Sequence, residues 1–269
     1  MVASSSTANA VRAVGTADDS PLWINKITTA DVTDALSRGI QDFRAIPTHS
    51  IFLGVLYALV VLIAVRVAFN SELYPMIFPI IAGFAILGPV AGIGLYELSR
   101  RRETGMETRW WHMFSVLQSP AIGSILGLGI VLMAVFFTWL AVASFLVHLT
   151  VGAGIEDTFN SFMSRVFGTS AGFALIIIGN VVGALFALLA FGISVIAFPL
   201  ILDRHVDMIT AALTSIQAVF TNPVPMMLWA AIVVAALLFG ALPLLLGLAI
   251  ALPILGHATW HLYRKVMPR

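Results

Sequence analysis

The chain of 269 residues contains no cysteine. Disulfides, thiolate metal sites, iron–sulfur ligation and cysteine nucleophiles are therefore excluded. Charge is also scarce: Asp, Glu, Lys and Arg make up 10% of the residues, against about a quarter in a typical soluble domain. Hydrophobic residues make up 60%, and the mean hydropathy is +1.01. With so little polar surface, the sequence predicts an integral membrane protein surrounded mostly by lipid.

The formal net charge is only +1, so the sequence offers no dense basic surface of the kind that nucleic acid requires. The first residues are small and polar and lack the apolar core of a secretory signal. We expect residues 1–25 to form a disordered cytoplasmic tail and residues 26–269 to form the transmembrane domain.

A helix that crosses the hydrocarbon core needs about twenty apolar residues. Residues 51–69, 76–98, 121–148 and 171–202 satisfy this requirement. A longer apolar run follows at residues 226–262, where Gly240 and Pro243 predict a turn that divides it into two spans. The alternative is one long helix with kinks at its prolines, which would place the C-terminus on the other side.

A duplicated phrase supports the division. GFAILGPVAGIGLYELSRRRE begins at Gly83, and GLAIALPILGHATWHLYRKV begins at Gly247. Aligning Pro89 with Pro253 also places the aromatic and basic ends of the two phrases in register. If the first phrase is a spanning helix, its copy near the C-terminus should be one as well.

A second repeat precedes the spans. DALSRGIQDFRAIP, WWHMFSVLQSP and LTSIQAVFTNP each end in proline just before an apolar run. Spacings of three and four predict an apolar helical stripe in each, with Asp42, Arg44, Gln118 and Gln217 off it. The stripes comprise Ile40 and Phe43, Met113 and Val116, and Ile216 and Val219. We therefore expect an all-α, polytopic membrane helix bundle of six transmembrane helices, arranged as three hairpins that each follow an interfacial amphipathic helix.

The cations predict the orientation. In the six-span arrangement one face receives only Arg66 and Arg165, and the other receives nearly all remaining Lys and Arg residues. Positive residues favour the cytoplasmic side, so both termini are expected there.

The segments QDFRAIP and GFAILGPVAGIGLYELSRRRETG resemble those of the bacterial membrane proteins grouped as domain of unknown function 2189. The resemblance extends from about residue 27 to the C-terminus. It implies a six-helix inner-membrane protein of unestablished biochemistry, and some members of that family carry the label of a cytochrome c oxidase subunit.

Few residues are candidates for chemistry. His257 and His261 lie four apart on one helical face, which suits either a metal or haem pair or an interfacial pair without metal. Arg66 is expected to bind an anionic solute, to pair with Glu72, or to reach the outer headgroups. Glu97 precedes the SRRR run, and either pairs with it or with a neighbouring subunit.

Asn180 is the most central polar side chain, and it suits either a solute path or an interhelical hydrogen bond. Small-residue spacings predict close helix packing at three pairs: Gly88 and Gly92, Gly123 and Gly127, and Gly179 and Gly183. The segment IEDTFNSFMSRVF, with Ile155, Phe159, Phe162 and Phe167 partly on one side, is expected either to cap the bundle or to dock a partner.

No nucleotide loop, zincin motif or Ser/His/Asp motif stands out in the sequence, and we expect no enzyme activity and no cofactor. The leading hypothesis is a non-catalytic accessory or assembly partner of a membrane complex such as a respiratory oxidase. The alternative is a small-solute permease or channel, suggested by the repeats, Asn180 and the helix prolines Pro89, Pro199 and Pro253. An intramembrane enzyme or haem carrier would rest on His257 and His261 alone.

Overall fold

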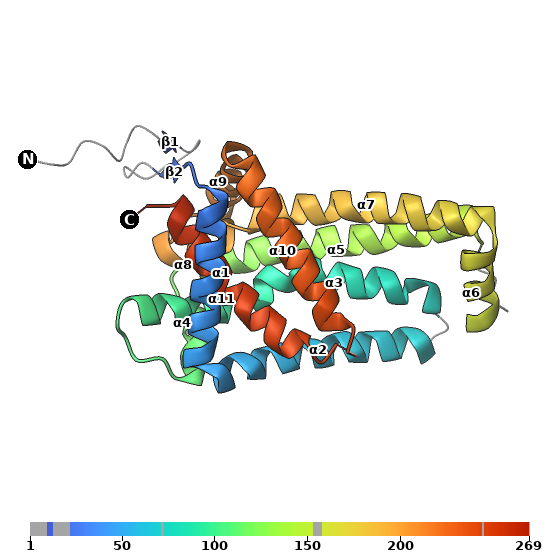
Figure 1. The fold of residues 1–269 in the computed structure, drawn as a ribbon, viewed down its shortest axis with the longest axis horizontal. Helices are drawn as coiled ribbons and strands as arrows, with labels where there is room; N and C mark the ends of the chain where they lie inside the picture. The colour runs from blue at the N-terminus through green and yellow to red at the C-terminus, as the bar shows by residue number, and fades with distance from the viewer. Residues whose placement is uncertain (1–9, 13–21, 71–72, 153–157, 244, 269) are drawn as a thin grey trace, which may run out of the picture. The chain divides into compact units, whose positions relative to one another are not determined.

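The computed structural model describes residues 10–12, 22–70, 73–152, 158–243 and 245–268 (Figure 1). The chain divides into two compact units. Unit 1 comprises residues 1–58, 89–129 and 191–269, and unit 2 comprises residues 59–88 and 130–190. Because α2 (Pro47–Asn70), α3 (Ile77–Ala91), α5 (Ile122–Thr150) and α7 (Ser170–Ser194) cross these boundaries, each contributes residues to both units.

The remaining elements belong to one unit each. Unit 2 also holds the short 3-10 helix η2 (Tyr74–Met76) and helix α6 (Phe159–Gly168). The rest lie in unit 1: β1 (Ala10–Arg12), β2 (Trp23–Asn25), α1 (Thr29–Ala45), α4 (Ile93–Glu103), the 3-10 helix η3 (Trp110–Gln118), α8 (Ala197–Arg204), α9 (Met208–Thr221), α10 (Pro223–Ala241) and α11 (Leu248–Val266).

Five helical segments among the described residues are long and apolar enough to cross a membrane. They are Ile51–Asn70, Tyr74–Glu103, Ile122–Thr150, Ser170–Arg204 and Pro223–Ala241, and they correspond to the first five predicted spans. The expected sixth span, α11, is not among them, because its second half is polar, with His257, Thr259, His261, Arg264 and Lys265. An all-α membrane protein is therefore confirmed, and the arrangement of six spans as three hairpins stays a prediction.

The division of the last apolar run is confirmed. Helix α10 ends at Ala241 and α11 begins at Leu248, so the alternative of one long kinked helix is wrong. Gly240 and Gly247 lie so close that a Cβ on Gly247 would meet the backbone of Gly240 at 2.8 Å. Only glycines allow the two helices to approach each other this closely where the chain turns.

Helix α1 begins at a capping box, in which the Thr28 side chain and the Asp31 carboxylate each accept a hydrogen bond from the other residue's backbone N–H. Its buried residues are Val32, Ala35, Gly39 and Asp42, at helical spacings of three and four. The predicted stripe of Ile40 and Phe43 is only half-buried, and the prediction that Asp42 lies on the water-facing side is wrong. The reason is that α1 lies along α11, and the small side chains allow that close contact (Figure 1).

The other two predicted amphipathic segments are also helical. Met113 and Val116 of η3 are buried, as the spacing predicts. In α9 the buried face consists instead of small residues such as Ala211 and Ala218, and the predicted stripe of Ile216 and Val219 is half-buried. Its exposed residues include large apolar ones: Ile209, Leu213 and Phe220. This inside-out pattern is typical of a helix that faces lipid rather than water.

The core of unit 1 lies where α4, α8 and α11 pack against one another. All residues of α8 from Ala197 to Leu202 are buried, and Trp260 and Tyr263 of α11 are among the largest fully buried side chains. These three helices form the ends of the returning segments of the three predicted repeats. The ends of the repeats therefore meet in one core.

Within unit 2, Trp139 of α5 contacts α3 through a hydrogen bond and close packing. Its indole Nε1 donates to the carbonyl of Pro79 at 2.8 Å, and a Cβ on Gly83 would lie 2.8 Å from its ring. Helix α6 packs Phe162 and Val166 into an apolar cluster of this unit, while Phe159 and Phe167 are exposed. The expected role of this segment in covering the helices agrees with that contact. Ile155 lies outside the described residues.

The predicted disordered tail, residues 1–25, lies largely outside the described residues. Of those described, β1 and β2 pair antiparallel, with Val11 opposite Ile24. Asn25 donates to the Lys265 carbonyl at 3.3 Å, and its own carbonyl accepts from the side chain of Asn222 at 3.0 Å. The chain before α1 is thereby attached to the end of α11.

Candidate functional site

Asp42 of α1 lies at the centre of a buried polar cluster formed by three helices. Helix α4 contributes Ser99 and Arg102, and α11 contributes His257 and His261; we call these five residues the Asp42 cluster. Asp42 Oδ2 accepts from Ser99 Oγ at 2.6 Å and from His261 Nε2 at 2.8 Å, and Oδ1 pairs with Arg102. Ser99 Oγ also lies 2.8 Å from His257 Nδ1.

The hydrogen bonds of the cluster determine the proton positions. A hydroxyl has one proton to donate, and Ser99 donates it to the carboxylate of Asp42. Its contact with His257 therefore requires the imidazole to donate from Nδ1. Every member then has a defined partner, although Ser99 and His257 are almost fully buried.

The Asp42 carboxylate is stabilised in its charged form. Burial alone raises the pKa of Asp42, but the hydrogen bonds from His261 and Ser99 help to outweigh it. The net result is a pKa of Asp42 below its ordinary value. A charged Asp42 holds α4 and α11 against α1 through charge-assisted hydrogen bonds.

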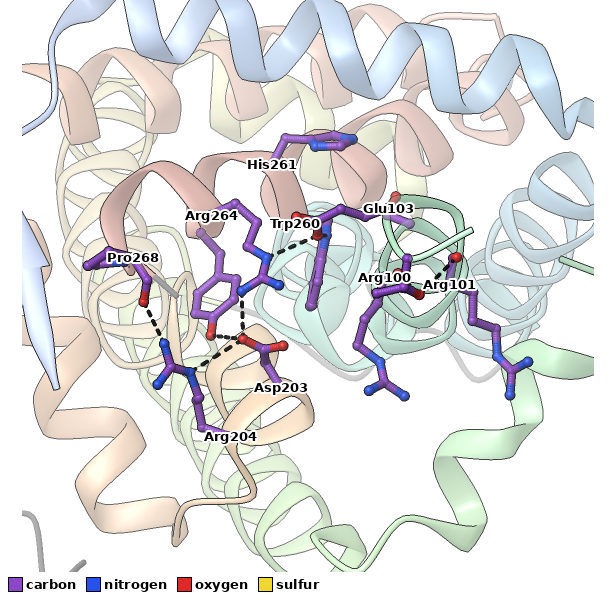
Figure 2. A network of polar contacts seen from close by, with 12 residues as sticks. Arg100, Arg101, Glu103, Asp203, Arg204, Trp260, His261, Arg264 and Pro268 are labelled. Carbon is purple, nitrogen blue, oxygen red and sulfur yellow. Dashed lines mark hydrogen bonds and ion pairs between the residues drawn. The ribbon is translucent and has the colours of Figure 1, made fainter. Parts of the chain in front are cut away.

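A second group of ion pairs joins α4, α8 and α11 (Figure 2). Arg264 lies between two carboxylates, with Nη1 2.8 Å from Asp203 Oδ2 and Nε 3.0 Å from Glu103 Oε2. The indole of Trp260 donates to the same Glu103 oxygen at 3.1 Å, and the Tyr263 hydroxyl donates to Asp203 at 2.6 Å. The two carboxylates thus bind one cation from the end of the chain.

Glu97 is almost fully buried and pairs within its own helix. Its oxygens lie 2.7 Å from Arg100 Nε and 2.8 Å from Arg101 Nε, and Ser115 of η3 donates to it at 3.3 Å. Of the two sequence alternatives, the pairing with the SRRR run is therefore confirmed.

A looser set of charges joins α1 to the end of α11. Lys265 Nζ lies 2.9 Å from Asp34 and 3.3 Å from Asp31. The hydrogen bond from Lys265 lowers the pKa of Asp34, and the same contact raises the pKa of Lys265. Because these side chains are partly exposed, each pair contributes only about 0–1 kcal/mol to stability.

His257 and His261 share one face of α11, as their spacing predicts, but the Asp42 cluster engages both rings. Among the described residues, no group of three or more His, Asp and Glu side chains has the arrangement of a metal site. The cluster therefore acts as a polar link between helices in this structure.

The two candidates from the spans lie on the surface of their helices. Arg66 is exposed on α2, and its suggested partner Glu72 lies outside the described residues. Asn180 is exposed on α7, and its amide donates to the Ile176 carbonyl of the same helix at 2.7 Å. This hydrogen bond stays within α7 and uses one of the two amide protons, so the interhelical hydrogen bond and the solute path both stay predictions.

Of the six predicted packing glycines, two are close to another helix. A Cβ on Gly127 would clash with Met208 Sδ, and a Cβ on Gly183 would lie 3.1 Å from the Trp139 ring. The others would meet open space or a side chain of their own segment: Gly88, Gly92, Gly123 and Gly179.

Several close helix approaches were missed, among them those at Gly39 and Gly256. A Cβ on Gly39 would lie 2.5 Å from the Cβ of Ala258, and one on Gly256 would lie 2.5 Å from Leu95 Cδ1. Gly39 continues the spacing of Val32 and Ala35, which was the signal available in the sequence. The apolar stripe did not indicate that Asp42 is buried, because Asp42 is polar and lies on the small-residue face of α1.

The comparisons with known proteins support the membrane assignment. Residues 77–203 match the family described as "Predicted integral membrane protein (DUF2189)". The resemblance noted from the sequence is confirmed over these residues, and its expected extension from residue 27 to the C-terminus stays a prediction. The DUF2189 match covers Ser99, Arg102, Glu103 and Asp203, whereas α1 and α11 lie outside it. No curated protein and no solved structure matches the chain.

Proposed function

We propose that this protein is a non-catalytic membrane protein that serves as an accessory or assembly partner of a larger membrane complex. One observation carries the proposal. Asp42 and Glu97 are the buried carboxylates among the described residues, and each is already paired with cations and a hydroxyl of unit 1. Carboxylates paired in this way serve to hold helices together, and they leave little capacity for acid–base catalysis or for binding an ion.

Exposed apolar surfaces on α5 and α7 also support the proposal. Apolar side chains with more than half of their surface exposed occur along α5 and α7, among them Ile130, Phe137, Ile177 and Leu185. Lipid tails or the apolar helices of another subunit can cover such surfaces. A respiratory oxidase is the partner that the sequence resemblance suggests.

The orientation belongs to the same proposal, with both termini on the cytoplasmic side of a bacterial inner membrane. The hydrogen bond from Asn25 to the Lys265 carbonyl supports a shared side, because it joins the two ends of the chain. A shared side requires an even number of crossings. If α10 is a fifth crossing, α11 must return the chain, which is the six-span arrangement. The excess of cations then favours the cytoplasm.

The test is photo-crosslinking in intact membranes followed by purification in a mild detergent. A photoreactive residue at Ile130, which is 70% exposed, is expected to capture a second membrane protein in stoichiometric yield. The matched control is the same residue at Leu132, which is fully buried two positions away and should capture none. Recovery of the chain alone from both positions, with no co-purifying subunit, would refute the proposal.

A permease is the second candidate, and interrupted spans favour it. The helical path breaks between α3 and α4 and again between α7 and α8, within segments that are candidate spans. Interrupted helices surround the transport path in many carriers. Against it, the backbone N–H of Ile196 at the second break donates to Ser215 Oγ at 3.1 Å, so a protein group already uses this donor. Flux of an anion, cation or osmolyte through vesicles containing the purified protein would favour the permease.

A further inference from the structure

The end of α4 carries an unbalanced positive charge. Arg100 and Arg101 both pair with Glu97, so two guanidinium groups share one carboxylate and one positive charge is left. Both arginine side chains are partly exposed, whereas Glu97 is buried beneath them. Their guanidinium groups point away from Asp203 and Glu103, so they take no part in the second group of ion pairs (Figure 2).

Exposed aromatic side chains lie beside this charge. Trp110, Trp111 and Phe114 of η3 are each more than 40% exposed. The Trp110 ring stacks edge-on to Phe52, with centroids 6.4 Å apart, and Phe52 lies at the start of the first candidate span. Tryptophan at the end of a span is typical of the headgroup level of a bilayer. The aromatic side chains of η3 therefore mark the membrane boundary of unit 1.

Glu97 links the two arginines of α4 to the aromatic helix η3. Ser115 of η3 donates to the carboxylate that holds Arg100 and Arg101, so η3 lies next to the two arginines. Arg109, at the start of η3, lies 5.0 Å from the Trp111 ring centre and pairs with the exposed Glu107. One surface thus combines exposed guanidinium groups with exposed rings at the end of a span.

An anionic phospholipid complements both parts. Its phosphate would neutralise the positive charge of Arg100 and Arg101 that Glu97 leaves unbalanced, in the bidentate geometry that guanidinium groups favour. Its acyl chains would cover the exposed rings, which a free phosphate ion cannot do. We propose that Arg100, Arg101 and the exposed aromatic side chains of η3 form a binding site for the headgroup of an anionic phospholipid.

The test uses the full chain reconstituted in nanodiscs that contain phosphatidylglycerol and phosphatidylcholine, with one of the two lipids brominated. Bromine quenches nearby tryptophan, so Trp110 and Trp111 report which lipid lies beside η3. We expect phosphatidylglycerol to be enriched there about five-fold, since one basic residue near an anionic headgroup supplies roughly that factor. Replacing both tryptophans by phenylalanine should remove the part of the quenching that arises beside η3, and the difference between the two proteins gives the signal of this site.

Single variants keep the buried Glu97 paired and so separate binding from folding. Arg100→Gln and Arg101→Gln should each bring the enrichment down toward one-fold, and Arg100→Lys should retain it because the charge remains. Arg38→Gln is the matched control, since Arg38 is an exposed arginine of α1 that pairs with Asp34 at 2.9 Å, and it should leave the enrichment unchanged.

Three results would overturn the proposal. The first is no enrichment of phosphatidylglycerol around the wild-type chain, and this measurement needs no variant to fold. The second is an unchanged enrichment in both glutamine variants. The third is loss of the enrichment when inorganic phosphate is added at constant ionic strength, which would assign the arginines to a soluble anion.

Discussion

Replacing Asp42 by asparagine should destabilise the folded chain strongly. Asn has the same shape but no charge, so Ser99, His261 and Arg102 lose a carboxylate partner. Hydrogen bonds to a charged group contribute about 1.5–3 kcal/mol each, and removing one partner of a buried pair costs about 3–5 kcal/mol. Since Arg102 is 41% exposed and can turn toward water, we expect a net loss of about 2–4 kcal/mol.

Thermal unfolding in detergent, followed by tryptophan fluorescence, measures this loss. Trp260 of α11 is fully buried beside the cluster, so its emission should report separation of the helices. Asp34→Asn is the control, because Asp34 is a partly exposed aspartate of the same helix and its removal should cost only about 0–1 kcal/mol. Equal melting temperatures for the two variants would refute the assignment of Asp42 as the link between α1, α4 and α11.

The remaining predictions concern pH and packing. The pKa of Asp42 is lower in the folded chain than in the unfolded chain. Charged Asp42 therefore stabilises the fold fully above the unfolded pKa of about 4, and this stabilisation is lost as the pH falls through the folded pKa. When the melting temperature is measured against falling pH, it should drop less for Asp42→Asn than for the wild-type chain. Gly39→Val should destabilise by at least about 1–3 kcal/mol, because a Cβ there meets Ala258, whereas Gly123→Ala should be nearly neutral in the same denaturation assay. Trp139→Phe should cost about 0.5–1.5 kcal/mol through loss of the Pro79 hydrogen bond, and unchanged unfolding would contradict that contact.

Much of the fold follows from local sequence patterns. The first four spans and α10 are continuous apolar runs, and the turn between α10 and α11 follows from Gly240 and Pro243. Amphipathic helices before Pro47, Pro120 and Pro223 follow from spacing. Such features depend on neighbouring residues, so a single sequence contains the information that they need.

The candidate site depended on contacts that are distant in sequence. Asp42 and His261 are separated by 219 positions, and no local periodicity indicates that they meet. Asp42 therefore looked like a water-facing residue, although its position on the small-residue face of α1 places it against α11. Glycine spacings show where small residues recur on a helix, but they do not show which helix packs there. The close contacts of Gly39 and Gly256 were therefore missed.

Contact between α1 and α11 is the central claim, and a designed disulfide tests it most directly. The chain has no cysteine, so Gly39→Cys with Ala258→Cys gives a single defined pair. A Cβ at residue 39 would lie 2.5 Å from the Cβ of Ala258, about 1 Å closer than a disulfide requires, so α1 and α11 must separate by that amount to form the bond, at a cost like that expected for Gly39→Val. Mild oxidation in membranes should give rapid intramolecular crosslinking, and Gly123→Cys with Ala258→Cys should give none. Failure of the first pair to crosslink, or crosslinking only between molecules, would contradict the account.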